Sequence, residues 1–144
     1  MDILAELSTG QLVAIEIQLK KVGCYLERAR YYEAGLVREQ LKSGETYDNL
    51  PPIIAIHLLD YMIYPDLEDS IHEYELINRN LFLRSLSETD MKRKKLLEQA
   101  AVLSGENIYL VEMRKEISDN NSEEFKNWMC FMTDPYKYST TISI

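Results

Sequence analysis

The sequence predicts an α/β fold in which a mixed β-sheet is flanked by helices. Residues 11–18 (QLVAIEIQ) alternate between apolar and polar side chains, which is typical of a strand with one buried face. The run IIAIHLL at 53–59 follows two prolines and is rich in β-branched residues, as buried strands are. Segments with helical periodicity separate such strands, and this alternation favours helices packed against one sheet.

The chain opens with a predicted β-hairpin followed by a helix. The hairpin strands cover 2–7 and 11–18, and residues 8–10 (STG) form a three-residue loop that ends in glycine. The helix covers 22–43, where apolar residues recur near helical spacing until a Ser-Gly pair ends it. The strand at 53–59 comes next along the chain.

The second half continues the alternation of strands and helices. Its predicted strands cover 71–77, 107–113 and, with a weaker pattern, 81–86. Its predicted helices cover 90–103 and 122–132, each with a capping residue at its start.

Length and composition predict one globular domain. The 144 residues suffice for a genuine core, and 46% of them are hydrophobic. We expect the domain over 1–132 and a C-terminal tail over 133–144. The N-terminus lacks the basic residues of a signal peptide, and no apolar stretch is long enough to span a bilayer. These features predict a cytoplasmic protein without a membrane partner.

The charge is unevenly distributed. The net charge is −8, which is unfavourable for contact with nucleic acid because phosphates are bound by Lys and Arg. Residues 19–42, however, hold six basic residues against three acidic ones, a net charge of +3. Lys20 and Lys21 open this basic segment. We therefore expect any anion-binding surface to lie on or near it.

The predicted hairpin brings two carboxylates together. If 8–10 form the loop, Ile3 pairs with Ile15 on one face, and Asp2 pairs with Glu16 on the other. Facing carboxylates have Cβ atoms ~5 Å apart and repel each other, whereas a hard cation such as Mg²⁺ would bind both. Gln18 lies two residues along the same face and could orient a water or a phosphate. From spacing alone, a solvated Glu16 and a frayed Asp2 stay an alternative.

Several motifs resemble one nuclease family. MDILAELSTGQLVAIEIQ resembles the Asp…Glu-x-Gln core of the PD-(D/E)XK nuclease superfamily, and specifically the recombination-promoting nuclease (Rpn) family, also described as transposases. The resemblance continues in the family's order through ERARYY, LKSGETYDNLPPIIAIHLLDY, NIYLVEMRK and WMCFM. As a set these motifs are fairly specific, although each is weak alone.

The resemblance implies a restriction-endonuclease-like core that cleaves DNA with Mg²⁺, or with Mn²⁺ in its place. It implies that Asp2 and Glu16 are metal ligands and that Asp2, Glu16 and Gln18 form the catalytic set. Gln18 stands where most of the superfamily has a lysine. Because a neutral amide cannot stabilise developing phosphate charge as an ammonium does, positioning is its expected role. Arg28 in ERARYY is expected to contact phosphate together with Lys20 and Lys21.

The chain departs from the family pattern at its start. The superfamily core places a helix and a strand before the Asp, whereas this sequence begins one residue before it. The expected core therefore lacks its first helix and strand. This departure leaves an alternative open, in which the chain is a catalytically incomplete homologue that acts as a protein-interaction or oligomerisation module. Its partner would be a second copy or a full-length homologue.

Other polar residues have simpler interpretations. Glu112 in LVEMRK is expected to pair with a neighbouring base. His57 and His72 are expected in core or surface roles, because neither has a second ligand at metal spacing. The KRKK run at 92–95 is expected to be a solvated helix face.

Overall fold

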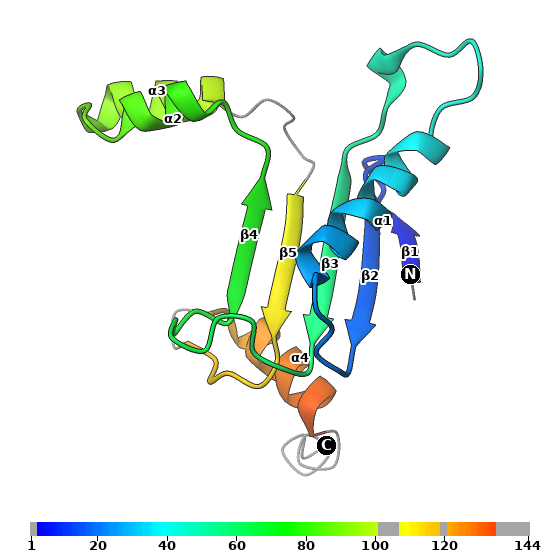
Figure 1. The fold of residues 1–144 in the computed structure, drawn as a ribbon, viewed down its shortest axis with the longest axis vertical. Coiled ribbons are helices and arrows are strands. Elements are labelled where there is room, and N and C mark those ends of the chain that lie inside the picture. The colour runs from blue at the N-terminus through cyan, green and yellow to red at the C-terminus, as the bar shows by residue number, and fades with distance from the viewer. Residues whose placement is uncertain (1–2, 101–106, 119–120, 135–144) are drawn as a thin grey trace.

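The computed structural model describes residues 3–100, 107–118 and 121–134, which form a five-stranded mixed sheet with four α-helices (Figure 1). The strands are β1 (Ile3–Glu6), β2 (Leu12–Gln18), β3 (Ile53–Leu59), β4 (Ile71–Glu75) and β5 (Asn107–Glu112). The helices are α1 (Tyr25–Glu39), α2 (Arg79–Ser85), α3 (Asp90–Ala100) and α4 (Glu123–Thr133), with a 3-10 turn η1 (Tyr47–Asn49) before β3. The predicted fold class is confirmed.

The strands lie in the order β1-β2-β3-β5-β4. β2, β3 and β5 are mutually parallel, while β1 and β4 run antiparallel to their neighbours at the two edges. The carboxyl ends of the three parallel strands therefore lie at the same end of the sheet, the lower end in Figure 1. Ligands of such sheets bind at the carboxyl ends of the strands.

The predicted hairpin register is confirmed for β1. Ile3 pairs with Ile15 and Ala5 pairs with Val13, and the Leu7 N–H donates to the Gln11 carbonyl at 2.8 Å to close the loop. Gly10 has a φ of 84°, the left-handed conformation that this loop requires. The predicted pairing of Asp2 with Glu16 involves Asp2, which lies outside the described residues.

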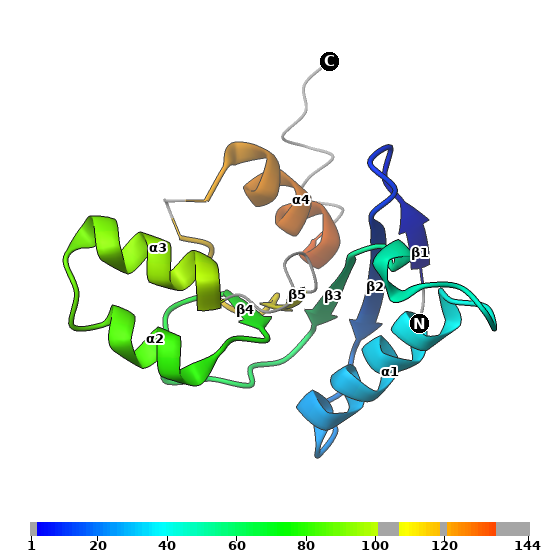
Figure 2. The ribbon, with the colours of Figure 1, turned by 90° about the horizontal axis from the view of Figure 1, so that it is seen from above.

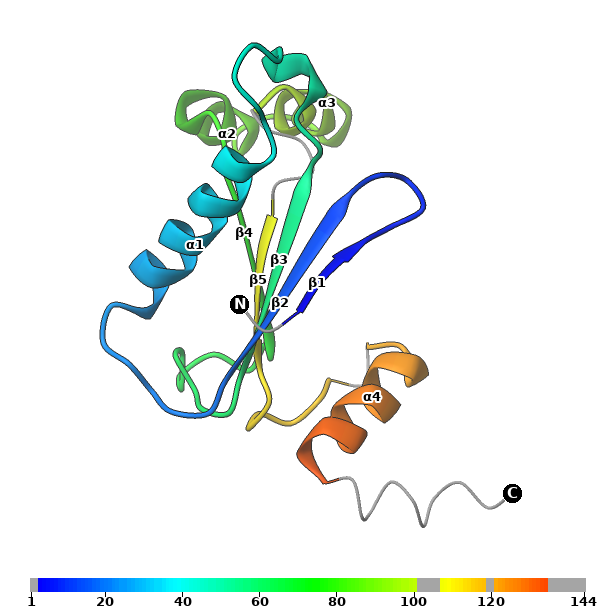
Figure 3. The same cartoon turned by 90° about the vertical axis from the view of Figure 1, so that its right-hand side faces the viewer.

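Helices cover both faces of the sheet. Figures 2 and 3 show α1 on one face and α4 on the other, whereas α2 and α3 form a hairpin beyond the end of β4. The core under α1 contains Tyr25, Ala55, Leu59, Ile108 and Leu110. The core under α4 contains Leu58, Val111, Met113 and Met129. Burial of these side chains supplies the main driving force for packing the layers.

The segment predicted as a strand at 81–86 is instead part of helix α2, and that prediction is wrong. The Asn78 side chain caps the helix, because its Oδ1 accepts from the N–H groups of Asn80 at 3.1 Å and Leu81 at 3.3 Å. A short apolar run fits a strand or a helix equally well by periodicity, and here the cap decides.

The remaining elements match their predictions with shifted ends. Helix α1 starts three residues later than predicted and ends before 43, and β4 is two residues shorter than 71–77. Ser122 caps α4 as expected, since its Oγ accepts from the Phe125 N–H at 3.2 Å. Part of the predicted helix at 90–103 and most of the tail at 133–144 lie outside the described residues.

Helix α1 begins at a strained residue. Cys24, its N-cap, has φ 60° and ψ 34° and makes no side-chain capping bond. For a residue with a Cβ the left-handed conformation costs roughly 1–2 kcal/mol. We expect Cys24→Gly to raise the free energy of unfolding by about 0.5–1 kcal/mol in urea denaturation, because glycine relieves this strain at some cost in unfolded-state entropy. Loss of stability in this variant would contradict the assignment of strain.

Candidate active site

Glu16 is a buried carboxylate on β2. Ala14 and Glu16 face α1 and are buried, whereas Ile15 and Ile17, on the opposite face, are less buried. Glu16 is only 8% exposed, so the solvated alternative is wrong for this residue. Because an ionised carboxylate without compensation is costly to bury, a charged or hydrogen-bonding partner is required.

Arg28 is a partner of Glu16. Its Nη2 lies 3.3 Å from Glu16 Oε1, and the guanidinium carbon lies 5.3 Å from the centroid of the Tyr32 ring. The sequence predicts that Arg28 contacts phosphate. The structure shows it beside the Glu16 carboxylate, which the sequence predicts to be a metal ligand.

The other predicted site residues lie at the carboxyl end of β2. Gln18 Nε2 donates to the Lys20 carbonyl at 3.1 Å, and Lys21 Nζ donates to the Met62 carbonyl at 3.4 Å. Both lysines are exposed. Asp2 lies outside the described residues.

His57, which the sequence places in a core or surface role, is buried and lies next to Glu16. It pairs with Glu16 in the parallel register of β2 and β3, and both line a cavity of about 520 Å³ next to α1. The Tyr25 hydroxyl lies 2.7 Å from His57 Nδ1 in the buried core. Burial lowers the pKa of His57; the Glu16 carboxylate opposes this shift and Arg28 adds to it. A polar residue opposite Glu16 in a parallel strand becomes visible only once the strand register is known.

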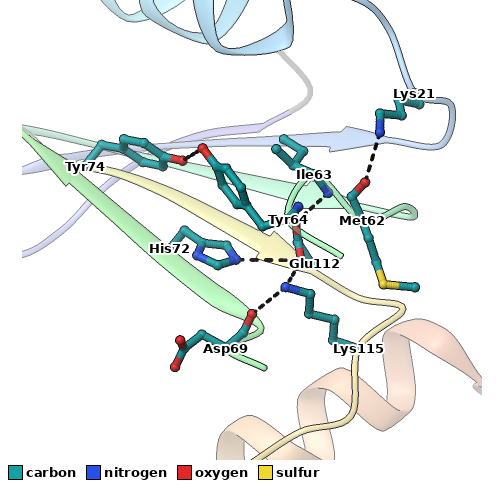
Figure 4. Close-up of polar contacts among 9 residues, drawn as sticks. All are labelled: Lys21, Met62, Ile63, Tyr64, Asp69, His72, Tyr74, Glu112 and Lys115. Carbon is teal, nitrogen blue, oxygen red and sulfur yellow. Dashed lines mark hydrogen bonds and ion pairs between the residues drawn. The ribbon is translucent and has the colours of Figure 1, made fainter. Parts of the chain in front are cut away.

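A second buried carboxylate, Glu112, holds the loop that follows β3 (Figure 4). Its Oε1 accepts from the N–H groups of Ile63 at 2.5 Å and Tyr64 at 2.8 Å. Its Oε2 forms an ion pair with Lys115 and lies 3.6 Å from His72 Nε2. The predicted pairing of Glu112 with a neighbouring base is therefore confirmed, and the two backbone bonds extend it.

The Lys115 side chain is itself only 6% exposed and also donates to the Asp69 carbonyl at 2.8 Å. Figure 4 shows the same loop reaching the Lys21 side chain through Met62. The Glu112 network thus ties the end of β5 to the loop that contacts the basic segment of the site.

The Glu112 network predicts a specific pH dependence of stability. Burial raises the pKa of Glu112, but Lys115 and the N–H groups of Tyr64 and Ile63 outweigh it, so the pKa lies below the usual 4.5. A carboxyl whose pKa is lower in the folded protein stabilises it above the unfolded pKa, and this contribution disappears as the pH falls.

We therefore expect the difference in unfolding free energy between wild type and Glu112→Gln to be largest near neutral pH and to shrink below pH 4.5. Urea denaturation of both proteins across this pH range measures it. A difference that stays constant into the acid range would contradict the lowered pKa.

The donors at Glu16 fit a hard divalent cation. No group of three His, Cys, Asp or Glu side chains in the part of the chain that the structure describes is arranged as a metal site. Glu16 and Gln18 nonetheless offer a carboxylate and an amide oxygen on one strand face, and Mg²⁺ uses one or two carboxylates with water and phosphate. A second carboxylate, which the family motif assigns to Asp2, would complete the protein's share.

No helix among the described residues has the length and apolar character that a membrane span requires.

Comparison with known proteins identifies the family. The family model for the PD-(D/E)XK nuclease family transposases matches residues 1–140. Searches of curated proteins and of solved structures returned no match. The matched region contains the β1–β2 hairpin, Glu16 and every described helix and strand. The chain belongs to the PD-(D/E)XK nuclease family transposases.

Proposed function

We propose that the protein is a metal-dependent DNA endonuclease that hydrolyses phosphodiester bonds at Asp2, Glu16 and Gln18 in the cytoplasm. The observation that carries the proposal is the burial of Glu16 beside Arg28, in the Glu-x-Gln stretch by which the sequence resembles the family's motif. A glutamate with only a solvated surface role would be exposed to water, whereas Glu16 is buried beside Arg28. We assign the catalytic domain to residues 1–132, with 133–144 as a tail.

The chain's own residues position the substrate and the cation. The register that pairs Ile3 with Ile15, continued by one residue, would pair Asp2 with Glu16, and these two carboxylates would hold Mg²⁺ or Mn²⁺. When bound, the ion supplies Lewis-acid polarisation of the scissile phosphate and makes water a better nucleophile. Gln18 would orient the attacking water or a phosphate oxygen.

The basic residues near β2 would bind the DNA backbone. Lys20 and Lys21 are exposed beside the carboxyl end of β2, and Arg28 lies on the helix directly above Glu16. Phosphate contacts made by such side chains position DNA without selecting a sequence, and their strength falls with salt because bound counterions are released.

Plasmid nicking tests this function. We expect the wild-type protein to relax supercoiled plasmid in Mg²⁺ or Mn²⁺, to lose this activity in EDTA, and to lose it progressively as salt rises. A mock purification from cells without the protein controls for contaminating nucleases. Absence of nicking at every metal concentration, or nicking that persists in EDTA, would overturn the proposal.

The second candidate function is a protein-interaction module without catalytic activity. It is favoured by the edge strand β1 and its turn, where Ile3, Leu4 and Leu7 are 44–51% exposed. Exposed apolar side chains on an edge strand suit pairing with a second copy or with a longer homologue. Inactive wild-type protein that forms a stable dimer in analytical ultracentrifugation would support this function over the nuclease.

A further inference from the structure

Arg28 supplies to Glu16 the charge compensation that a bound cation would also supply. The Glu16 carboxylate is 8% exposed, and Arg28 brings a full positive charge to Oε1 at 3.3 Å. A divalent cation bound to the same carboxylate would supply the same compensation with twice the charge. Cation and guanidinium would then repel each other at short range.

The contact between Arg28 and Glu16 is suited to exchange. It is a single N···O approach at 3.3 Å, the Arg28 side chain is 38% exposed, and Arg28 Nε is buried with no hydrogen-bond partner among the described residues. By contrast, Arg114 binds Asp60 through two hydrogen bonds, at 2.6 and 2.9 Å, in the two-pronged geometry of a strong pair. The pair with Glu16 therefore uses little of the hydrogen-bonding capacity of Arg28.

Arg28 also has a second contact that does not depend on Glu16. Its guanidinium lies over Tyr32, one helical turn further along α1, with 5.3 Å between the guanidinium carbon and the ring centroid. The Tyr32 ring can keep the Arg28 side chain close to the site after its contact with the Glu16 carboxylate is broken. Released from Glu16, the five donors of the guanidinium match the oxygens of a DNA phosphate.

We propose that Arg28 is an exchangeable counter-ion: it compensates Glu16 in the cation-free protein, is displaced when a divalent cation binds Glu16, and then binds DNA phosphate. This inference rests on the proposed function. It makes Arg28 a positioning residue with opposite effects on the two ligands. Arg28 weakens cation binding when DNA is absent and strengthens DNA binding when the cation is present. By linkage, the factor by which the cation strengthens DNA binding is also the factor by which DNA strengthens cation binding.

Mn²⁺ binding without DNA tests the exchange. We expect isothermal titration calorimetry to show about tenfold tighter Mn²⁺ binding to Arg28→Gln than to wild type, because the competing charge is removed. Arg30→Gln is the matched control. It removes the same charge from the same helix, but Arg30 is exposed and points roughly 200° around α1 from Arg28. We expect Arg30→Gln to change Mn²⁺ affinity by about twofold at most, through long-range charge alone.

The DNA arm has the opposite sign. In fluorescence anisotropy with labelled duplex, adding Ca²⁺ should increase the affinity of wild type about tenfold more than that of Arg28→Gln. Circular dichroism checks that the variants fold, and Arg28→Met, which keeps most of the aliphatic stem, replaces Arg28→Gln if that variant does not fold.

The outcomes separate the two proposals. If Glu16→Gln abolishes Mn²⁺ binding but Arg28→Gln binds Mn²⁺ no more tightly than Arg30→Gln, the counter-ion exchange is overturned and the metal site stands. If Mn²⁺ does not bind wild type, or binds Glu16→Gln equally well, both the exchange and the proposed function are overturned.

Discussion

Glu16→Gln is expected to lower the rate of Mg²⁺-dependent plasmid nicking by about 10²–10³-fold, the loss seen when a group that stabilises transition-state charge is removed. The substitution keeps the shape of the side chain but removes the negative charge that would hold the cation. Arg28, already 38% exposed, can turn toward water, so the fold should survive with a loss of roughly 1–2 kcal/mol.

The matched control for this prediction is Glu27→Gln. Glu27 is exposed in the first turn of α1, so its substitution makes the same chemical change at a position that the proposed site does not use. Its nicking rate should stay within about twofold of wild type, as expected for the substitution of an exposed side chain. Equal losses in both variants would mean that net charge, and not the position of Glu16, controls activity.

Glu112→Ala is expected to destabilise the protein by about 3–5 kcal/mol, a large share of the 5–15 kcal/mol typical of a domain. The substitution leaves the Lys115 ammonium, 6% exposed, without its ion partner. It also leaves the N–H groups of Ile63 and Tyr64 without an acceptor. Urea denaturation monitored by circular dichroism measures the loss.

Two further variants define the origin of that loss. Glu116→Ala removes an exposed carboxylate four residues on and should cost under about 0.5 kcal/mol. The double variant Glu112→Leu with Lys115→Met should recover part of the stability, because replacing a buried pair by apolar residues costs less than breaking it. Recovery should be incomplete, since the two backbone N–H groups stay unpaired. A loss below about 1 kcal/mol in Glu112→Ala would show that water reaches the network.

The sequence predicts the sheet better than it predicts the site. The period-two pattern at 11–18 and the glycine that ends the loop suffice to define the hairpin register, and the strands predicted at 53–59 and 107–113 are both observed, the second one residue shorter. The short run at 81–86 was ambiguous, and a single Asn78 side chain decided its conformation.

The surroundings of Glu16 depend on contacts that are distant in the sequence. Alternation along β2 predicts that Glu16 and Ile15 lie on opposite faces of the sheet. Which of the two faces is more deeply buried depends on the packing of α1. The neighbour His57 follows from the β2–β3 register, and the contact of Glu112 with His72 follows from the β4–β5 register. Lys115 is three residues from Glu112, which is why that pair alone could be predicted.

Strand β1 has a consequence for the local stability of the site. It has four residues, pairs with β2 alone among the described strands, and exposes every one of its side chains, whereas β3 and β5 are buried at the centre of the sheet. Amide hydrogen exchange should therefore be much faster in β1 than in β3, because a strand with few buried contacts opens without unfolding the rest. Asp2, the proposed second metal ligand, directly precedes this strand in the sequence. A cation bound between the two hairpin strands would slow amide exchange in β1 and leave exchange in β3 unchanged. Cation binding and the local opening of β1 would then be thermodynamically coupled.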